Sequence, residues 1–350
     1  MKTLLITWWT WFIWSCAVVE FEKAGYKTVI VDNLSNSDKK VLDNIKKVLG
    51  YDVDFFEVDL LDKERLENIF KKYNFDGVIH FAWLKAVWES CEKPLMYFNN
   101  NIIGSLNLFS LMEKYNVNNL IFSSSATVYD LSPNNKDLVE IKWKDVILRR
   151  WIKETDITWN TTNPYWKTKF ILEEILKDLA KFSNFKAIIL RYFNPIGAHT
   201  SGLIWENPKW IPNNLLPYIM KVAKWELHQV NVFWNDYPIK DGTWVRDYIN
   251  VNDLVSWHIK AYKKLEKEKL HYLDVFNLWV WEWVSVLEMI KTTEEVVWKK
   301  ITYKIVQRRP WDLAEVFCDP SKANKILNWE AKTSLKESIK QAWSYYNQLN

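Results

Sequence analysis

A tyrosine and a lysine four positions apart, Tyr165 and Lys169, stand in "NPYWKTK" (163–169) at the start of a predicted helix. Residues at this spacing share one helix face, and a lysine ammonium there can lower the pKa of a phenol from its usual value of about 10 toward neutrality. Ser125 ends a predicted parallel strand, where α/β proteins form their sites. We expect Tyr165 to act as a general base while Ser125 hydrogen-bonds the same substrate hydroxyl.

Taken alone, a Tyr and a Lys at this spacing describe an ordinary exposed helix pair, so the interpretation depends on the elements around them. Apolar strands alternate with amphipathic helices along the first half of the chain. The predicted strands are 4–7, 26–33, 53–60, 77–82, 119–129 and 186–194, and the predicted helices are 15–24, 63–73, 96–115 and one that follows 163. This α/β alternation predicts a doubly wound parallel sheet of the Rossmann type.

The first strand-to-helix turn, "TWWTWFIW" (7–14), has four tryptophans where a dinucleotide-binding turn carries glycines. Glycine lets a pyrophosphate approach the backbone at the helix N-terminus. With glycine at each tryptophan the turn becomes TGGTGFIG, the G-x-x-G-x-x-G form. A secretory signal is the alternative interpretation of this apolar start, but the βαβ pattern continues straight through it.

The composition points to the same exchange. The 350 residues include 7 glycines and 23 tryptophans, whereas glycine makes up about 7% of an ordinary soluble chain. The net charge is +4, and no basic run is dense enough to predict nucleic-acid binding.

The three cysteines, Cys16, Cys91 and Cys318, are widely spaced. This spacing argues against a disulfide framework or a metal cluster, so we expect no metal and a cytoplasmic location. No stretch is long and apolar enough to predict a membrane span.

Ten motifs then follow in a specific order: "DNLSNS" (32–37), "VDL" (58–60), "HFAWLKAVWES" (80–90), "FNNN" (98–101), "FSSSATVY" (122–129), "NPYWKTK", "LRYFNPIGAH" (190–199), "IPNNLLPY" (211–218), "NDYPIKDGTWVRDYI" (235–249) and "RRPWDL" (308–313). Together they resemble the UDP-glucose 4-epimerases of the extended short-chain dehydrogenase superfamily over nearly the whole chain. The resemblance implies a Tyr165 base, a 4-keto intermediate and return of the C4 hydride to the other face of the sugar.

The resemblance also implies NAD as the cofactor, because an acid at Asp32 would take the ribose hydroxyls and repel a 2′-phosphate. The positions that match the family's cofactor contacts are Phe12, Ile13, Asp32, Asn33, Leu34, Ser35, Asn36, Ser37, Asp59, Leu60, Phe81, Ala82, Trp83, Leu84, Lys85, Asn100, Ser125, Tyr165, Lys169 and Phe193. Those that match its UDP-sugar contacts are Asn194, Asn214, Val232, Phe233, Arg246, Arg309 and Asp312.

The implied domains are an NAD-binding Rossmann domain over 1–194, with an insertion at about 130–162, and a lobe over 195–350 that mainly binds the UDP-sugar. The boundary is soft, because late strands can return to the first sheet. The family is usually dimeric, so we expect a homodimer through helices that include 96–115.

Two related activities are alternatives. A nucleotide-sugar 4,6-dehydratase shares the fold, but its family carries an Asp-Glu pair where Ala126 and Thr127 stand here. A UDP-glucuronate epimerase is disfavoured by "NNLLPY" and "NDYPIKDGTWVRDY". Val316 aligns with the wall beside the sugar's 2-position, where the lack of an aromatic ring predicts tolerance of UDP-N-acetylglucosamine.

Eighteen tryptophans occupy positions at which the family has glycine: 8, 9, 11, 14, 83, 88, 166, 205, 210, 225, 234, 244, 257, 279, 281, 283, 298 and 311. Tryptophan is the worst substitute wherever glycine is needed for positive φ or close backbone approach. We therefore expect that the gene uses UGA as a glycine codon. If the tryptophans at 8, 9, 11 and 14 are real, we expect a protein that binds no NAD and is inactive.

Overall fold

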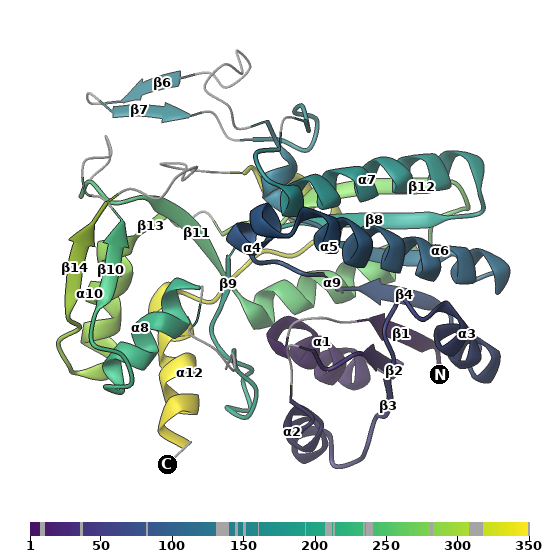
Figure 1. Ribbon diagram of the computed structural model, residues 1–350, viewed down its shortest axis with the longest axis horizontal. Coiled ribbons are helices and arrows are strands. Elements are labelled where there is room, and N and C mark those ends of the chain that lie inside the picture. Colours follow the sequence, from purple (N-terminus) through teal and green to yellow (C-terminus); the bar gives the residue numbers. More distant parts are fainter. Residues whose placement is uncertain are drawn as a thin grey trace.

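The computed structural model describes residues 1–7, 11–35, 38–81, 83–130, 140–143, 146–149, 152–159, 161–192, 194–206, 212, 214–233, 235, 241–280, 283–307 and 318–348. Figure 1 shows two lobes, a large one built on a parallel sheet and a smaller one that carries the C-terminus.

The large lobe has a seven-stranded sheet in the order β12-β8-β5-β4-β1-β2-β3, with every neighbouring pair parallel. Its strands are β1 (Thr3–Thr7), β2 (Lys27–Asp32), β3 (Asp54–Glu57), β4 (Gly77–His80), β5 (Asn119–Ser123), β8 (Lys186–Arg191) and β12 (Tyr272–Asn277). The central strands are buried along almost their whole length, as expected of a sheet covered on both faces. The predicted Rossmann-type fold is confirmed.

Helices cover both faces of this sheet (Figure 1). One face packs against α1 (Trp11–Lys23), α2 (Lys40–Leu49) and α9 (Val251–Leu265), whose apolar residues join one core. The other face packs against α3 (Lys63–Lys72), α6 (Gly104–Lys114) and α7 (Pro164–Phe182), whose apolar residues form a second core.

Several predicted bounds are wrong. Strand β3 ends at Glu57 rather than residue 60, and β8 ends at Arg191 rather than residue 194. Helix α1 begins at Trp11 rather than residue 15. The helix predicted over 96–115 consists of α5 (Pro94–Phe98), a π-helical turn η1 (Asn99–Ile103) and α6. Strand β5 ends at Ser123, because the Ser125 side chain accepts a hydrogen bond from the Thr127 N–H and starts a 3₁₀ turn, η2 (Ala126–Val128). The sequence analysis also missed α2 and a short α4 (Val87–Glu92).

The smaller lobe combines short strands with helices. Strand β11 (Val245–Asn250) pairs with β9 (Asn194–Ile196) and β13 (Trp283–Ser285), and β10 (Val230–Phe233) pairs with β14 (Tyr303–Val306). The helices are α8 (Leu215–Ala223), α10 (Val286–Val297) and α12 (Leu335–Gln348), whereas α11 (Ser321–Leu327) packs against β12 and α9 of the large lobe. Strand β12 and helix α9 come from the second half of the chain but belong to the large lobe, and the domain division at residue 194 stays a prediction.

The segment predicted as an insertion contains a two-stranded antiparallel hairpin of β6 (Glu140–Trp143) and β7 (Val146–Arg149). Figure 1 shows the hairpin standing away from both lobes. Among the described residues, no helix has the length and apolar character needed to cross a membrane.

Two tryptophans end helices in a conformation suited to glycine. After α8, the Trp225 N–H bonds the Val222 carbonyl and the Glu226 N–H bonds the Lys221 carbonyl, and Trp225 has φ +65°. This is a Schellman motif, whose left-handed position is usually glycine. Gly25 occupies the same position after α1, with φ +89°. Trp298 ends α10 at φ +54°, and both indoles are exposed, at 77% for Trp225 and 91% for Trp298.

Glycine at either position should stabilise the fold. We expect Trp225→Gly and Trp298→Gly each to raise the free energy of unfolding by about 1 kcal/mol, because a left-handed backbone strains a residue with a Cβ. Urea denaturation measures the change. Trp159 is exposed but does not have positive φ, so Trp159→Gly is the control and should give no gain. An equal gain at all three positions contradicts the backbone explanation.

Candidate active site

A pocket of about 600 Å³ opens at the carboxyl ends of the parallel strands, between the two lobes. Parallel α/β sheets form their binding sites at this edge. The large lobe contributes Ser125, Tyr165 and Lys169, and the smaller lobe contributes Asn194 and Arg246. Residues from the two halves of the sequence therefore meet in one cavity.

The start of α7 places the tyrosine and the lysine. Asn163 caps the helix, with its side-chain oxygen accepting from the Trp166 N–H at 3.0 Å, and Pro164 fits the first turn. Tyr165 then lies on the first turn and Lys169 on the next, and both side chains line the pocket. Ser125 caps η2 and its Oγ accepts from the Thr127 hydroxyl at 2.9 Å.

Lys169 does not have the environment that the sequence predicts. Its Nζ donates to the Ser123 carbonyl at 2.7 Å and lies 3.3 Å from the centre of the Trp83 ring. The side chain is only 1% exposed, and burial holds the pKa of its ammonium well below the usual value. The ammonium is covered by an indole and a carbonyl.

The predicted lowering of the Tyr165 pKa is wrong for this structure. Burial raises the pKa of the phenol, with no compensating contribution from Lys169. The physical reason is the position of the ammonium, which faces the Trp83 ring and the Ser123 carbonyl.

The opposite wall of the pocket joins the lobes through polar contacts. Asn214, at the N-cap of α8, donates to Glu206 at 2.6 Å, and Lys85 lies 3.6 Å from the same carboxylate. The Arg246 guanidinium lies 4.7 Å from the Trp244 ring centre and donates to the Val245 carbonyl. Among the described lining residues, Glu206 is the one carboxylate.

The residues predicted around an adenosine gather at the ends of β2 and β3. Asp32 is buried at the end of β2, and the Asn33 side chain donates to Asp59 at 2.7 Å. Ser35 bonds the Asn33 oxygen through its N–H and its hydroxyl. Leu34 has φ +54°. These contacts make a shaped polar loop beside the start of α1.

The predicted site residues that line the pocket are Ile13, Phe81, Trp83, Lys85, Ser125, Tyr165, Lys169, Asn194, Asn214, Phe233 and Arg246. Asp32, Asn33, Leu34, Ser35, Asp59 and Leu60 form the second group just described, in which the Leu60 carbonyl accepts from Asn107. Asn36, Ser37, Ala82, Phe193, Arg309, Asp312 and Val316 lie outside the described residues.

Four predicted residues are set back from the pocket. Phe12 is buried and packs edge-on against Trp205, with ring centres 5.8 Å apart. Val232 is buried in the core. Leu84 and Asn100 bond the buried Asn101 side chain. The roles of all the predicted site residues stay predictions.

Sequence reasoning missed three functional positions. Asn101, in η1, bonds both backbone groups of Leu84 and the Thr168 hydroxyl of α7. Tyr192 lines the pocket and forms a short hydrogen bond with Ser123. Glu206 holds Asn214. The third asparagine of "FNNN" and the acid of "GLIWEN" were available signals, but nothing local marks them as facing the site.

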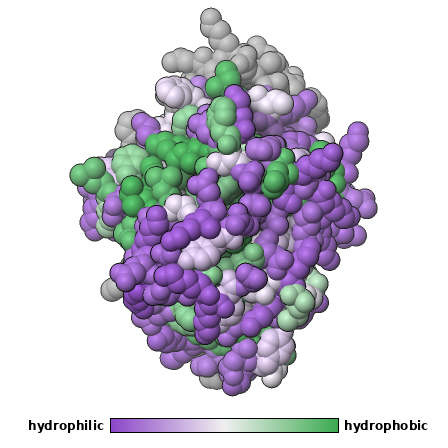
Figure 2. Space-filling view, turned by 90° about the vertical axis from the view of Figure 1, so that its right-hand side faces the viewer, coloured by the Kyte–Doolittle hydropathy of each residue, from purple (hydrophilic) through white to green (hydrophobic). Residues whose placement is uncertain are grey.

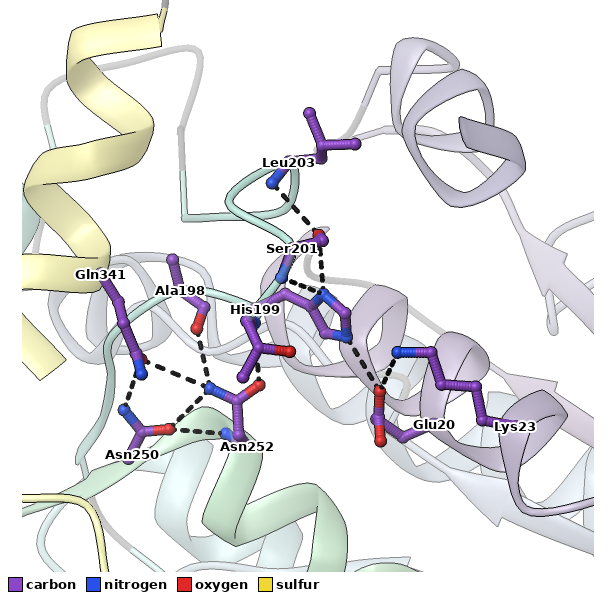
Figure 3. Close-up of polar contacts among 10 residues, drawn as sticks. Glu20, Lys23, Ala198, His199, Ser201, Leu203, Asn250, Asn252 and Gln341 are labelled. Atoms are coloured by element: carbon purple, nitrogen blue, oxygen red, sulfur yellow. Dashed lines mark hydrogen bonds and ion pairs between the residues drawn. The ribbon is translucent and has the colours of Figure 1, made fainter. Parts of the chain in front are cut away.

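A polar network fastens α1 to the smaller lobe (Figure 3). The Ser201 N–H donates to His199 Nδ1 at 3.1 Å, so the ring proton is on Nε2, which donates to Glu20 Oε1 at 3.0 Å. Lys23 donates to the same oxygen at 2.8 Å. The loop of His199 is held in turn by Asn252, which donates to the Ala198 carbonyl at 2.8 Å.

Comparisons with known proteins agree with this geometry. A family profile described as GDP-mannose 4,6 dehydratase matches residues 5–342. The chain is 44% identical over 343 residues to the UDP-glucose 4-epimerase of Bacillus subtilis, covering 98% of this chain and 96% of that protein. The chain belongs to the UDP-glucose 4-epimerase family.

Solved structures extend the likeness to the fold of these epimerases. The UDP-glucose 4-epimerase of Bifidobacterium longum, in complex with NAD⁺ and UDP, is 39% identical with a TM-score of 0.90 over 99% of this chain and 98% of that chain. That of Stenotrophomonas maltophila, with bound NAD and formylated UDP-arabinopyranose, is 37% identical with a TM-score of 0.90 over 100% and 99%. The resemblance predicted from the motifs is confirmed.

Although the matching family profile is described as a dehydratase, the residues after Ser125 are not those expected of a 4,6-dehydratase. The positions of the expected Asp-Glu pair are Ala126 and Thr127, both buried in η2. Glu206 is already engaged by Asn214 and Lys85. The described pocket therefore lacks an acid at the place from which a 4,6-dehydratase expels a hydroxyl.

The His199–Glu20 contact makes stability depend on pH. The His199 hydrogen bond, followed by that of Lys23, lowers the pKa of Glu20 from 4.5 to about 2. A lowered pKa in the folded state contributes stability above pH 4.5, and that stability is lost as the pH falls toward 2. Glu20→Gln should therefore cost clearly more stability at pH 6 than at pH 3, where part of the contribution is already lost, as measured by denaturation at both values.

Variants of His199 and Lys23 separate the contributions of these two donors to the lowered pKa of Glu20. His199→Asn should remove more of the pH-dependent difference than Lys23→Met, because the histidine contributes more to the lowered pKa. The assignment is contradicted if Lys23→Met removes the larger share.

Proposed function

We propose that this protein interconverts UDP-glucose and UDP-galactose. The observation that carries the proposal is the meeting of Ser125, Tyr165 and Lys169 with Asn194 and Arg246 in one pocket, in a chain of the epimerase family. Bound NAD accepts the C4 hydride and returns it, so no net oxidation occurs. Because the Trp83 ring covers Lys169, the proposal is for the chain with glycine at the eighteen positions.

Tyr165 takes the proton of the sugar 4-hydroxyl, and Ser125 orients that hydroxyl. The half-buried phenol is a poor base while its pKa is raised, so the lysine ammonium must face it to stabilise the phenolate. With the indole removed, Lys169 is one helical turn away on the same face of α7. The proton returns from Tyr165 when the 4-keto sugar is reduced.

The UDP end needs a firmer hold than the sugar, which must turn over between the two hydride transfers. Arg246 is buried and lines the pocket, and a guanidinium presents forked donors that suit a diphosphate. Asn214 and Phe233 flank it on the smaller lobe. Arg309, Asp312 and Val232 are assigned to the same task by the family resemblance.

The assay that tests the function follows conversion of UDP-glucose to UDP-galactose by the eighteen-glycine protein. UDP-N-acetylglucosamine and UDP-glucuronate are the alternative substrates, and kcat/KM for all three ranks them. We expect UDP-glucose to rank first and the N-acetylated sugar to be converted measurably. No conversion of any of the three contradicts the proposal.

Tyr165→Phe isolates the proton transfer. The ring remains, so binding of NAD and UDP should be unchanged, while kcat should fall by about 10² to 10⁴-fold because the base is lost. Tyr97→Phe is the control, since Tyr97 is a buried tyrosine whose hydroxyl bonds Glu89. If the Tyr165 variant keeps kcat within threefold of the parent, another group takes the proton.

The proposed location is the cytoplasm. Cys16, Cys91 and Cys318 are all free thiols, two of them buried. Free thiols are typical of a reducing compartment.

The proposed assembly is a homodimer through helices that include α5, η1 and α6, the predicted helix over 96–115. Leu95, Met96, Ile103 and Leu106 are exposed along α5, η1 and α6, and solvent-exposed apolar clusters of this kind mark protein contacts. Figure 2, which turns the α6 side toward the viewer, shows apolar side chains gathered in its upper left part.

A charged residue among these exposed apolar side chains of α5, η1 and α6 should separate the subunits. We expect light scattering to give a dimeric mass for the parent and a monomeric mass for Ile103→Glu, because a dimer would bury the carboxylate without a partner. Tyr303→Glu, at an exposed position on β14 in the smaller lobe, is the control and should remain dimeric. A monomeric parent at micromolar concentration overturns the assembly.

A further inference from the structure

We infer that position 83 is glycine in the working protein and that an indole there disables the site by capping Lys169. The inference rests on the proposed function for its account of what Lys169 does. It extends to the other seventeen tryptophans at family glycine positions, because one change in codon meaning explains them together.

The Trp83 indole that caps Lys169 is packed against neighbouring aromatic rings. The Trp83 ring lies 4.6 Å from the His80 ring centre and 4.9 Å from that of Phe122. Its Nε1 has no hydrogen-bond partner among the described residues. The indole thus packs against two rings and the Lys169 ammonium, and only 5% of Trp83 is exposed.

The ammonium is already engaged by two groups. One of its three protons is donated to the Ser123 carbonyl at 2.7 Å, and the Trp83 ring centre lies 3.3 Å from Nζ. An ammonium over an aromatic face is itself a stabilising contact, so the cap also resists opening. Lys169 lines the pocket, but its side chain is only 1% exposed, so a ribose or sugar hydroxyl must displace the indole to bond the ammonium.

Glycine at position 83 removes this obstruction because it has no side chain. The residue follows β4 at the carboxyl edge of the sheet, directly beside the pocket that Tyr165 lines. With no side chain at 83, the space of the indole joins the cavity and Lys169 faces it. The cofactor and the lysine then meet, which the indole prevents.

At two other positions, the backbone conformation also favours glycine over tryptophan. Trp225 occupies the left-handed position of a Schellman motif, as Gly25 does in this same chain, and Trp298 ends α10 in the left-handed region. At 83 glycine supplies open space; at 225 and 298 it supplies backbone freedom. Selection for tryptophan explains neither, whereas a gene that reads UGA as glycine explains both.

The experiment compares three proteins expressed from synthetic genes. The first has glycine at all eighteen positions, the second retains Trp83 alone, and the third has alanine at 83 as a matched control for the loss of glycine. The readouts are NAD released on denaturation, and the pKa of Tyr165 from ultraviolet titration corrected with Tyr165→Phe.

We expect the glycine and alanine proteins to retain NAD and to titrate Tyr165 about one to three pH units below the Trp83 protein. The Trp83 protein should contain at least tenfold less NAD than the glycine protein. Equal NAD content and equal titration in the glycine and Trp83 proteins overturn the inference.

The two proposals fail separately. If the glycine protein shows the NAD gain and the lower Tyr165 pKa but converts no UDP-sugar, the inference stands and the proposed function fails. Codon 83 of the gene gives an independent result: TGA supports the inference, and TGG overturns it.

Discussion

The buried pair between Arg191 and Glu173 is the constraint that the active site depends on. The Arg191 guanidinium at the end of β8 bonds both oxygens of Glu173 on α7, and the Ser124 hydroxyl donates to the same carboxylate at 2.5 Å. Both charged side chains are almost fully buried, so losing one partner would leave an unpaired buried charge. The pair fixes the helix of Tyr165 against β8, and the Ser124 contact joins it to the segment of Ser125 that follows β5.

Around that pair, the site is assembled from segments that the sheet brings together. Asn101 connects the loop after β4 to α7, and the His199–Glu20 contact fastens α1 to the smaller lobe. The first connection joins two segments that carry proposed cofactor and catalytic residues, and the second joins the proposed cofactor residues of α1 to the lobe that carries proposed substrate residues. The geometry of the pocket therefore depends on these few buried polar contacts.

The tryptophans show where a missing side chain matters physically. Trp14 and Trp257 are wholly buried, so the core accommodates an indole where neighbouring elements leave space. Trp225 and Trp298 are strained by the backbone conformation, and Trp83 covers a functional ammonium. Glycine can be required for core space, for a left-handed backbone or for ligand access. Tryptophan therefore has a different effect at each of these positions.

The sequence by itself determined the Rossmann-type layers, the Tyr165 and Lys169 spacing and the acid at the end of β2, because strand and helix periodicity and helix-face geometry are local properties. Only the tertiary structure decided that β12 returns beside β8, that Asn101 and Glu206 support the site, and that Trp83 covers Lys169. These outcomes depend on contacts between residues far apart in the chain, such as the 86 positions that separate Trp83 from Lys169. No local pattern specifies which distant side chains a fold brings together.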